Sequence, residues 1–229
     1  MPVSLALLLS NLLMVQGMDQ WLADQLYAWQ GQQWQWRDAW LTSTVLHRGG
    51  RLLSVLLCVA TLVACIWCWC RPAHQTHTAQ WRWPLLYLVL AGVLSTSLVS
   101  LLKATSQMDC PWHLTRYGGS LPLVGLFESR PAGMPRAACF PAGHASAGYA
   151  WVCLYFVARM REKGWHWIGL SIGLLAGLVF GFTQQLRGAH FLSHDLWSLV
   201  ICWLVSLGLY VLMRKKAGVP HPVQDGVLA

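Results

Sequence analysis

The sequence predicts an all-α membrane protein with six transmembrane helices, an interfacial segment and a polar site on its outer face. Hydrophobic residues make up 56% of the 229 residues and charged residues only 10%, whereas soluble domains carry about 25% charged residues. The mean hydropathy is +0.46. Several apolar stretches approach the roughly 20 residues that a helix needs to cross a bilayer. The chain therefore has too little polar surface to cover a soluble fold.

Six segments are interpreted as membrane spans, at about residues 3–18, 51–70, 84–103, 146–160, 166–186 and 194–213. The first is short, and its apolar core "LALLLSNLLMV" could alternatively belong to a signal peptide. A signal peptide has a basic residue before its core and a small-x-small cleavage site. Neither stands out in the sequence, so we expect a retained span.

Lysine and arginine in the loops predict the orientation, because cytoplasmic loops are enriched in them. Eight Lys or Arg lie in three short stretches, "RPAHQTHTAQWR", "RMREKG" and "RKK", which share one face. The opposite face also holds eight, five of them diluted over two long loops at about 19–50 and 104–145 that carry five acidic residues. The clustered face is therefore predicted to be cytoplasmic, with both termini inside.

This topology divides the chain into four regions. Residues 1–50 hold the first span and an outer interfacial helix or loop, and 51–83 hold the second span and a cytoplasmic loop. Residues 84–213 form a core of four spans, and 214–229 form a cytoplasmic tail. The first outer loop contains five of the fifteen tryptophans. Because Trp favours the membrane–water interface, a helix along the outer leaflet or a loop anchored by its aromatic rings is expected there.

The cysteines fall into two groups. Cys110 and Cys139 lie in the long outer loop, where an oxidising compartment would allow a disulfide, and unpaired thiols are the alternative. In apolar spans Cys usually acts as a small hydrophobic residue. The cysteines within or at the ends of spans are Cys58, Cys65, Cys68, Cys70, Cys153 and Cys202.

Polar residues gather in three islands, each at the outer end of a span. The islands are "LKATSQMDCPWHLTRYGG", "CFPAGHASAGYAW" and "RGAHFLSHD". Their convergence on one face indicates function, because ionisable residues at membrane depth are costly. Cations, histidines and a small-residue turn that opens a helix suit a phosphate group. One histidine can attack phosphorus while a second protonates the departing oxygen, and this scheme requires no metal.

The islands resemble the type 2 phosphatidic acid phosphatase family of integral membrane lipid phosphatases. The first motif of this family is a Lys followed, after six residues, by Arg-Pro. The second motif is Pro-Ser-Gly-His. The third motif is Ser-Arg, followed after five residues by His and after three more residues by Asp. This chain has "KATSQMDCP", "PAGH" and "RGAHFLSHD" in that order. The resemblance implies that Lys103 and the backbone at Gly143 bind phosphate, that His144 protonates the leaving oxygen, and that His190 attacks phosphorus to form a phosphohistidine. It also implies a bacterial inner membrane with the site facing the periplasm, and no cofactor.

The motifs depart from the family pattern at three positions. Cys110 stands in place of arginine in the first motif, Ala142 replaces serine in the second, and Gln184 replaces arginine in the third. Arg187, three residues before His190, and Arg116 are candidates to restore the missing cations.

Two residues are candidates for the partner that orients His190. The family has Asp four residues after the nucleophile, where this chain has His194, and Asp195 follows. On one continuous helix His194 would share the face of His190. If Ser193 caps a helix that begins there, Asp195 could reach back instead. We favour Asp195 because a carboxylate stabilises an imidazolium better than a neutral imidazole does, with His194 as the rival.

Other functions remain in competition with a lipid phosphatase. His190, His194, Asp195 and a distant His144 could bind a divalent metal. The basic pocket could bind an anionic headgroup without catalysis, as in a transporter or lipid-binding protein. Alternatively, a second lipid hydroxyl could accept the phosphoryl group, which would make the protein a phosphotransferase. We expect a metal-independent enzyme whose partners are the membrane and a lipid phosphate or diphosphate, without nucleic acid. Candidate substrates implied by the family are phosphatidate, phosphatidylglycerol phosphate, isoprenoid diphosphates and lipid A; the sequence predicts no oligomeric state.

Overall fold

The protein is an α-helical bundle in the computed structural model, which describes residues 2–72, 74, 76–126 and 128–216. Its helices are α1 (Pro2–Ser10), α2 (Met18–Trp29), α3 (Gly50–Cys70), α4 (Thr76–Ala79), α5 (Arg82–Ser106), α6 (Gly143–Tyr149), α7 (Cys153–Met160), α8 (His166–Leu186) and α9 (Leu192–Met213). Shorter turns are the π-helical η1 (Asn11–Val15) and η2 (Trp40–Gly49), and the 3-10 turns η3 (Pro111–His113), η4 (Thr115–Tyr117) and η5 (Ala150–Val152). No strand occurs among these residues, and the predicted tail lies outside them from residue 217 onward.

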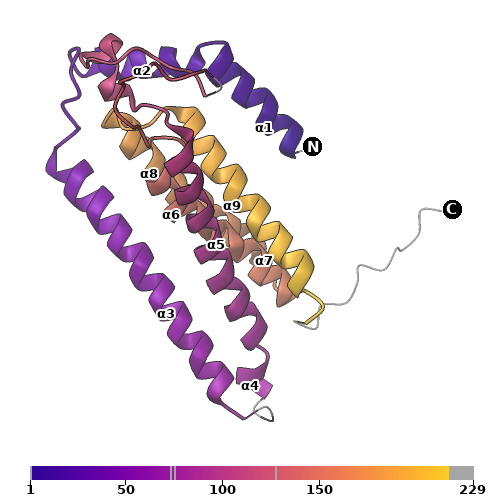
Figure 1. Cartoon of the computed structure of the whole chain (residues 1–229). Helices are drawn as coiled ribbons and strands as arrows, with labels where there is room; N and C mark the ends of the chain where they lie inside the picture. The colour runs from indigo at the N-terminus through magenta and orange to yellow at the C-terminus, as the bar shows by residue number, and fades with distance from the viewer. Residues whose placement is uncertain (1, 73, 75, 127, 217–229) are drawn as a thin grey trace.

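The long helices run side by side, with α2 across one end of the bundle and α4 at the other (Figure 1). We call the first the loop end, because the segment between α5 and α6 also lies there, and the second the opposite end. Four segments are long and apolar enough to cross a membrane: Trp40–Cys70, His77–His113, His166–Leu186 and Leu192–Met213. They correspond to the second, third, fifth and sixth predicted spans.

The first and fourth predicted spans form shorter helices. The first becomes α1 and η1, with nine and five residues, or about 20 Å at roughly 1.5 Å per residue. The fourth becomes α6, η5 and α7, in which a 3-10 turn interrupts the helix after Tyr149. Trp197 Nε1 on α9 donates a hydrogen bond of 3.0 Å to Ser10 Oγ, so α1 lies against α9.

Helix α8 packs against its neighbours through a glycine at every fourth position. A Cβ on Gly177 would lie 2.0 Å from the Tyr149 ring, and a Cβ on Gly181 would lie 2.5 Å from Asp195 Oδ2. Such small residues allow helix backbones to approach closely. The stripe therefore fixes α8 against α6 and α9, which carry site residues. The buried glycines of α8 are Gly169, Gly173, Gly177 and Gly181.

Helix α2 is fastened to the loop end by polar and aromatic contacts. Asp19 Oδ1 accepts the backbone N–H of Ser193 at 2.9 Å, which satisfies one of the free amides at the start of α9. The rings of Tyr27, Trp34 and Tyr117 lie 5.1 to 5.7 Å apart between centroids. The predicted interfacial segment is thus a helix packed across the end of the bundle.

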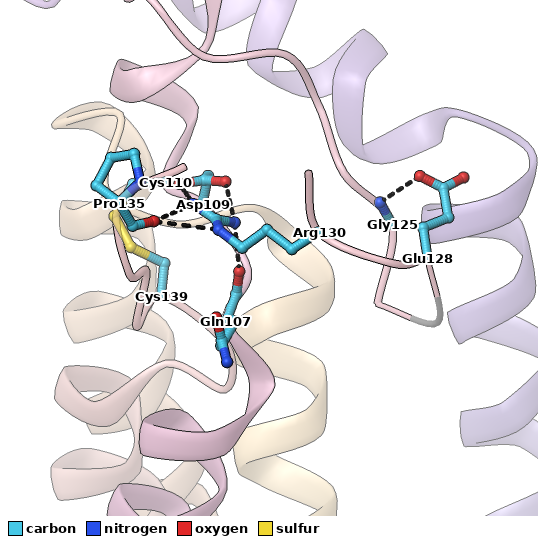
Figure 2. Close-up of polar contacts among 8 residues, drawn as sticks. All are labelled: Gln107, Asp109, Cys110, Gly125, Glu128, Arg130, Pro135 and Cys139. Carbon is cyan, nitrogen blue, oxygen red and sulfur yellow. Dashed lines mark hydrogen bonds and ion pairs between the residues drawn. A yellow bond between two sulfur atoms is a disulfide. The ribbon is translucent and has the colours of Figure 1, made fainter. Parts of the chain in front are cut away.

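The long loop between α5 and α6 is held by a disulfide and a buried ion pair (Figure 2). Cys110 and Cys139 are joined, which is the first of the two predicted alternatives. Arg130 donates from Nη1 to Asp109 Oδ2 at 2.7 Å and to the carbonyl of Gln107 at 2.8 Å. These links hold the parts of the loop around Arg130 and Cys139 against the residues that follow α5.

Cations lie over tryptophan rings at the opposite end. The Arg71 guanidinium lies 4.9 Å from the Trp67 ring centroid, and that of Arg161 lies 5.0 Å from that of Trp81. Such pairs are typical of a membrane–water interface, where both residue types are enriched.

Candidate active site

A cavity of about 920 Å³ lies at the loop end and continues between α3 and α5. Of the predicted site residues, Lys103, Gly143, His144, Arg187 and His190 line it, although they come from α5, α6 and the turn after α8. The basic and imidazole side chains in its lining are those of His47, Arg51, Lys103, His144, Arg187 and His190.

His190 lies in the turn between α8 and α9 and contacts His194 through its inner ring nitrogen. The two Nδ1 atoms are 3.3 Å apart, and both side chains are buried. A contact between two imidazole nitrogens needs one donor and one acceptor, so the pair shares one proton there. With that proton on His190, its Nε2 carries a free lone pair. Burial lowers the pKa of His190 well below its ordinary value, which keeps the imidazole neutral.

Asp195 makes no hydrogen bond to His190, although we favoured it in the sequence as the residue that orients this ring. Its Oδ2 accepts a hydrogen bond of 2.6 Å from Gln185 Nε2, and its carboxylate lies against Gly181 on α8. The reason is that α9 begins at Leu192 rather than at Ser193. His194 therefore points back to the turn that holds His190, and Asp195, about 100° farther round the helix, faces α8.

His144 stands in the first turn of α6 and is held on three sides. Its Nε2 lies 3.2 Å from the carbonyl oxygen of Leu46. Its ring stacks on Phe180 at 4.7 Å and contacts His47 at 4.5 Å. Because a carbonyl can only accept, Nε2 carries a proton, and Nδ1 is the position where a second proton is gained or lost.

Lys103 and Gly143 form the third part of the site. A Cβ on Gly143 would lie 3.8 Å from Lys103 Nζ, so the ammonium group is next to the opening turn of α6. The first amides of a helix have no intrahelical acceptor and favour an anion. A cation, free amides and two imidazoles thus converge on one cavity.

Arg187 and Arg116 have different positions. Arg187 lines the cavity and donates to Gln184 Oε1 at 3.1 Å and to the carbonyl of Arg37 at 2.7 Å. Arg116 forms an exposed bidentate pair with Asp24 on α2, at 2.6 and 2.7 Å, and does not line the cavity. The prediction that Arg116 restores a missing cation is therefore not supported.

The sequence model of the PAP2 superfamily matches residues 83–217, which is more than half of the chain. The chain belongs to the PAP2 superfamily. No curated relative and no solved structure matches it. Membership implies phosphatase activity of the lipid phosphatase type on a phosphate ester, and members are generally metal-independent. The four long apolar helices indicate an integral membrane protein.

The three departures from the family motifs have distinct structural settings. Cys110, in place of arginine, forms half of the disulfide at the edge of the cavity. Ala142, in place of serine, is fully buried in an apolar cluster with Ala145 and Tyr149. Gln184, in place of arginine, lines the cavity and donates to His47 Nδ1 at 3.1 Å.

Two cavity residues, His47 and Arg51, were missed by the sequence analysis. They precede the family segment and belong to none of its motifs, and Arg51 stood out only as one of the basic residues of the outer face. His47 and Arg51 are four residues apart at the start of an apolar span, which puts them on one helix face. This spacing is the sequence signal by which they could have been predicted. The competing metal site does not assemble in the described residues, where no group of three or more His, Cys, Asp or Glu side chains is arranged to hold an ion.

Proposed function

We propose that this protein is a membrane lipid phosphatase that hydrolyses a phosphomonoester or diphosphate of an amphiphilic lipid through a phosphohistidine intermediate. The observation that carries the proposal is the shape and lining of the cavity, which joins the basic and imidazole cluster to an apolar groove. The groove is lined by Val55, Val59 and Leu62 of α3 and by Leu88 and Val93 of α5.

The two ends of this cavity suit the two ends of a lipid phosphate. The groove between α3 and α5 offers apolar side chains to a hydrocarbon tail. Lys103 and the amides that follow Ala142 offer positive charge and hydrogen-bond donors to the phosphate. A soluble phosphate ester would leave the apolar half of the cavity unfilled, so we favour an amphiphile.

In the first half of the reaction, His190 Nε2 attacks phosphorus and the bond from phosphorus to the leaving oxygen breaks. His194 Nδ1 accepts the hydrogen bond from His190 Nδ1–H and stabilises the positive charge that the ring acquires. His144 gives a proton to the leaving oxygen from Nδ1. A bound phosphate favours the protonated form of His144, because a nearby negative charge raises the pKa of an imidazole.

In the second half, water attacks the phosphohistidine and His144 takes its proton. The products are inorganic phosphate and neutral His190, so atoms and charge balance over the cycle. A lipid hydroxyl in place of water would transfer the phosphoryl group instead, which is the phosphotransferase alternative.

We propose six membrane crossings, with the site facing the periplasm of a bacterial inner membrane. The disulfide between Cys110 and Cys139 supports an oxidising compartment at the loop end. The clustered Lys and Arg at the opposite end support a cytoplasmic location for that end. Five crossings follow from α3, α5, the α6–α7 segment, α8 and α9, and α1 with η1 supplies the sixth.

The test is phosphate release by the purified protein from phosphatidate, phosphatidylglycerol phosphate, an isoprenoid diphosphate and lipid A, each with a chelator present. We expect release from at least one of these lipids, and phosphate trapped on His190 after an alkaline quench, because the P–N bond of a phosphohistidine is stable in alkali and labile in acid. His190→Ala should abolish release and His144→Ala should nearly do so, whereas His113→Ala, an exposed histidine of the same end outside the cavity, should have no effect. Lipid binding without turnover would favour the anionic-lipid binder and overturn the proposal.

A further inference from the structure

His47 is joined to the third family motif although it lies 137 residues away from it in sequence. Gln184 Nε2 is 3.1 Å from His47 Nδ1, and Arg187 Nη1 is 3.1 Å from Gln184 Oε1. The three side chains thus form a chain of hydrogen bonds along one wall of the cavity, which all three line.

The direction of these hydrogen bonds fixes the proton on His47. Arginine can only donate, so Gln184 must offer its oxygen to Arg187 and its amide N–H to His47. His47 Nδ1 is then an acceptor and carries no proton. A neutral imidazole has one N–H group, and in His47 that group is at Nε2.

The protonated nitrogen of His47 is available to a ligand. Within the described residues, Nε2 of His47 has no hydrogen-bond partner, while its side chain lines the same cavity as Lys103 and His190. Its ring lies 4.5 Å from that of His144 between centroids. A phosphate held among Lys103, His144 and His190 therefore has the N–H of His47 at its edge.

We infer that His47 is a substrate-binding residue that donates from Nε2 to a phosphate oxygen and takes the place of the arginine that the third motif lacks. Gln184 stands at the position of that arginine and, instead of contacting phosphate as a cation, sets the tautomer of His47. Arg187 is a positioning residue that orients the Gln184 amide. The ligand's identity as a lipid phosphate rests on the proposed function.

The inference explains why a residue before the family segment reaches the site. His47 lies on η2, immediately before α3, so η2 offers a donor to the phosphate while α3 lines the apolar groove. Arg51, four residues later, also lines the cavity and is exposed. The groove of α3 and the donor of His47 then bind one molecule together.

The test measures the affinity of orthovanadate, a phosphate analogue, for the full-length protein in detergent, by inhibition and by calorimetry. A hydrogen bond to a charged group corresponds to about 10- to 100-fold in affinity. His47→Ala should weaken binding by that factor, and His47→Gln, which keeps an N–H donor, should recover part of it. His113→Ala is the matched control, and elution as a single species shows that each variant is folded.

The role of Gln184 has its own readout. Gln184→Met removes the amide at similar volume and should weaken orthovanadate binding in the wild-type background, but have no further effect when His47→Ala is already present. Such non-additivity is expected of residues that act as one unit. Additive losses, or a His47→Ala variant that binds orthovanadate like the wild type, would overturn the inference.

The outcomes also separate this inference from the proposed function. If the wild type hydrolyses lipid phosphates and His47→Ala is unaffected in both orthovanadate affinity and kcat/KM, the inference alone fails. If the wild type releases no phosphate from any lipid but binds orthovanadate in a manner that depends on His47, the inference holds and the phosphatase proposal fails.

Discussion

Replacing His194 gives the sharpest test of how the nucleophile is oriented. His194→Leu removes the nitrogen that lies 3.3 Å from His190 Nδ1 and leaves an apolar side chain in a fully buried position. The Nδ1–H of His190 then has no acceptor at the moment when its ring becomes positively charged. His194→Asn retains an acceptor on a side chain that branches at the same distance from the backbone.

The size of the effect follows from the lost hydrogen bond. A hydrogen bond to a charged group contributes about 1.5 to 3 kcal/mol, and about 1.4 kcal/mol corresponds to a factor of ten. We therefore expect His194→Leu to lower kcat about 10- to 100-fold with KM changed little, because the charge develops only in the transition state. His194→Asn should lose less than tenfold.

The assay is steady-state phosphate release at saturating lipid phosphate, together with the rate at which phosphate appears on His190 in a single turnover. Asp195→Asn is the matched comparison, since Asn still offers an oxygen to Gln185. It should stay within about threefold of the wild type, as expected of a side chain without contact to the reacting groups. A larger loss in Asp195→Asn than in His194→Leu would refute the assignment of His194.

Three further predictions concern His144, the packing behind it, and Arg116. Because the Nε2–H of His144 is committed to the Leu46 carbonyl, we expect the proton that Nδ1 gives to the leaving oxygen to enter with a substrate monoanion, whose second pKa is about 6. The value of kcat/KM should then fall about tenfold per unit above pH 6, and a fall that already begins below pH 6 would contradict this. Gly50→Ala should lower kcat/KM about tenfold. A Cβ there would lie 2.7 Å from Phe180, which stacks on His144, so the histidine would be displaced. The control is Gly208→Ala, whose added Cβ meets nothing within 4 Å and which should match the wild type in the same assay. Arg116→Ala should leave kcat/KM unchanged and lower the free energy of unfolding by at most about 1 kcal/mol, since it breaks only an exposed ion pair; a tenfold loss of activity would return Arg116 to the site.

Sequence patterns and family motifs predicted the residues whose roles depend on local chemistry. His144 and His190 stood out because imidazoles are rare beside apolar spans, and both line the cavity. The predicted fifth span has the bounds of α8, His166–Leu186, since an uninterrupted apolar run of that length has few alternatives to a helix in a membrane. The predicted first and fourth spans are shorter helices in the structure, since short apolar runs do not reveal where they bend or end.

The sequence by itself determined the all-α membrane class, the family, and part of the polar cluster at one end of the bundle, namely Lys103, His144, Arg187 and His190. Those properties depend on composition and on motifs within single segments. Only the tertiary structure decided that His194 rather than Asp195 contacts His190, that Arg116 pairs with Asp24, and that His47 meets Gln184. The first physical reason is that each residue of a helix is rotated by about 100° from the one before it, so a helix that begins one residue earlier directs a different side chain at the same neighbour. The second is that contacts between distant helices depend on the packing of apolar faces whose sequences look alike.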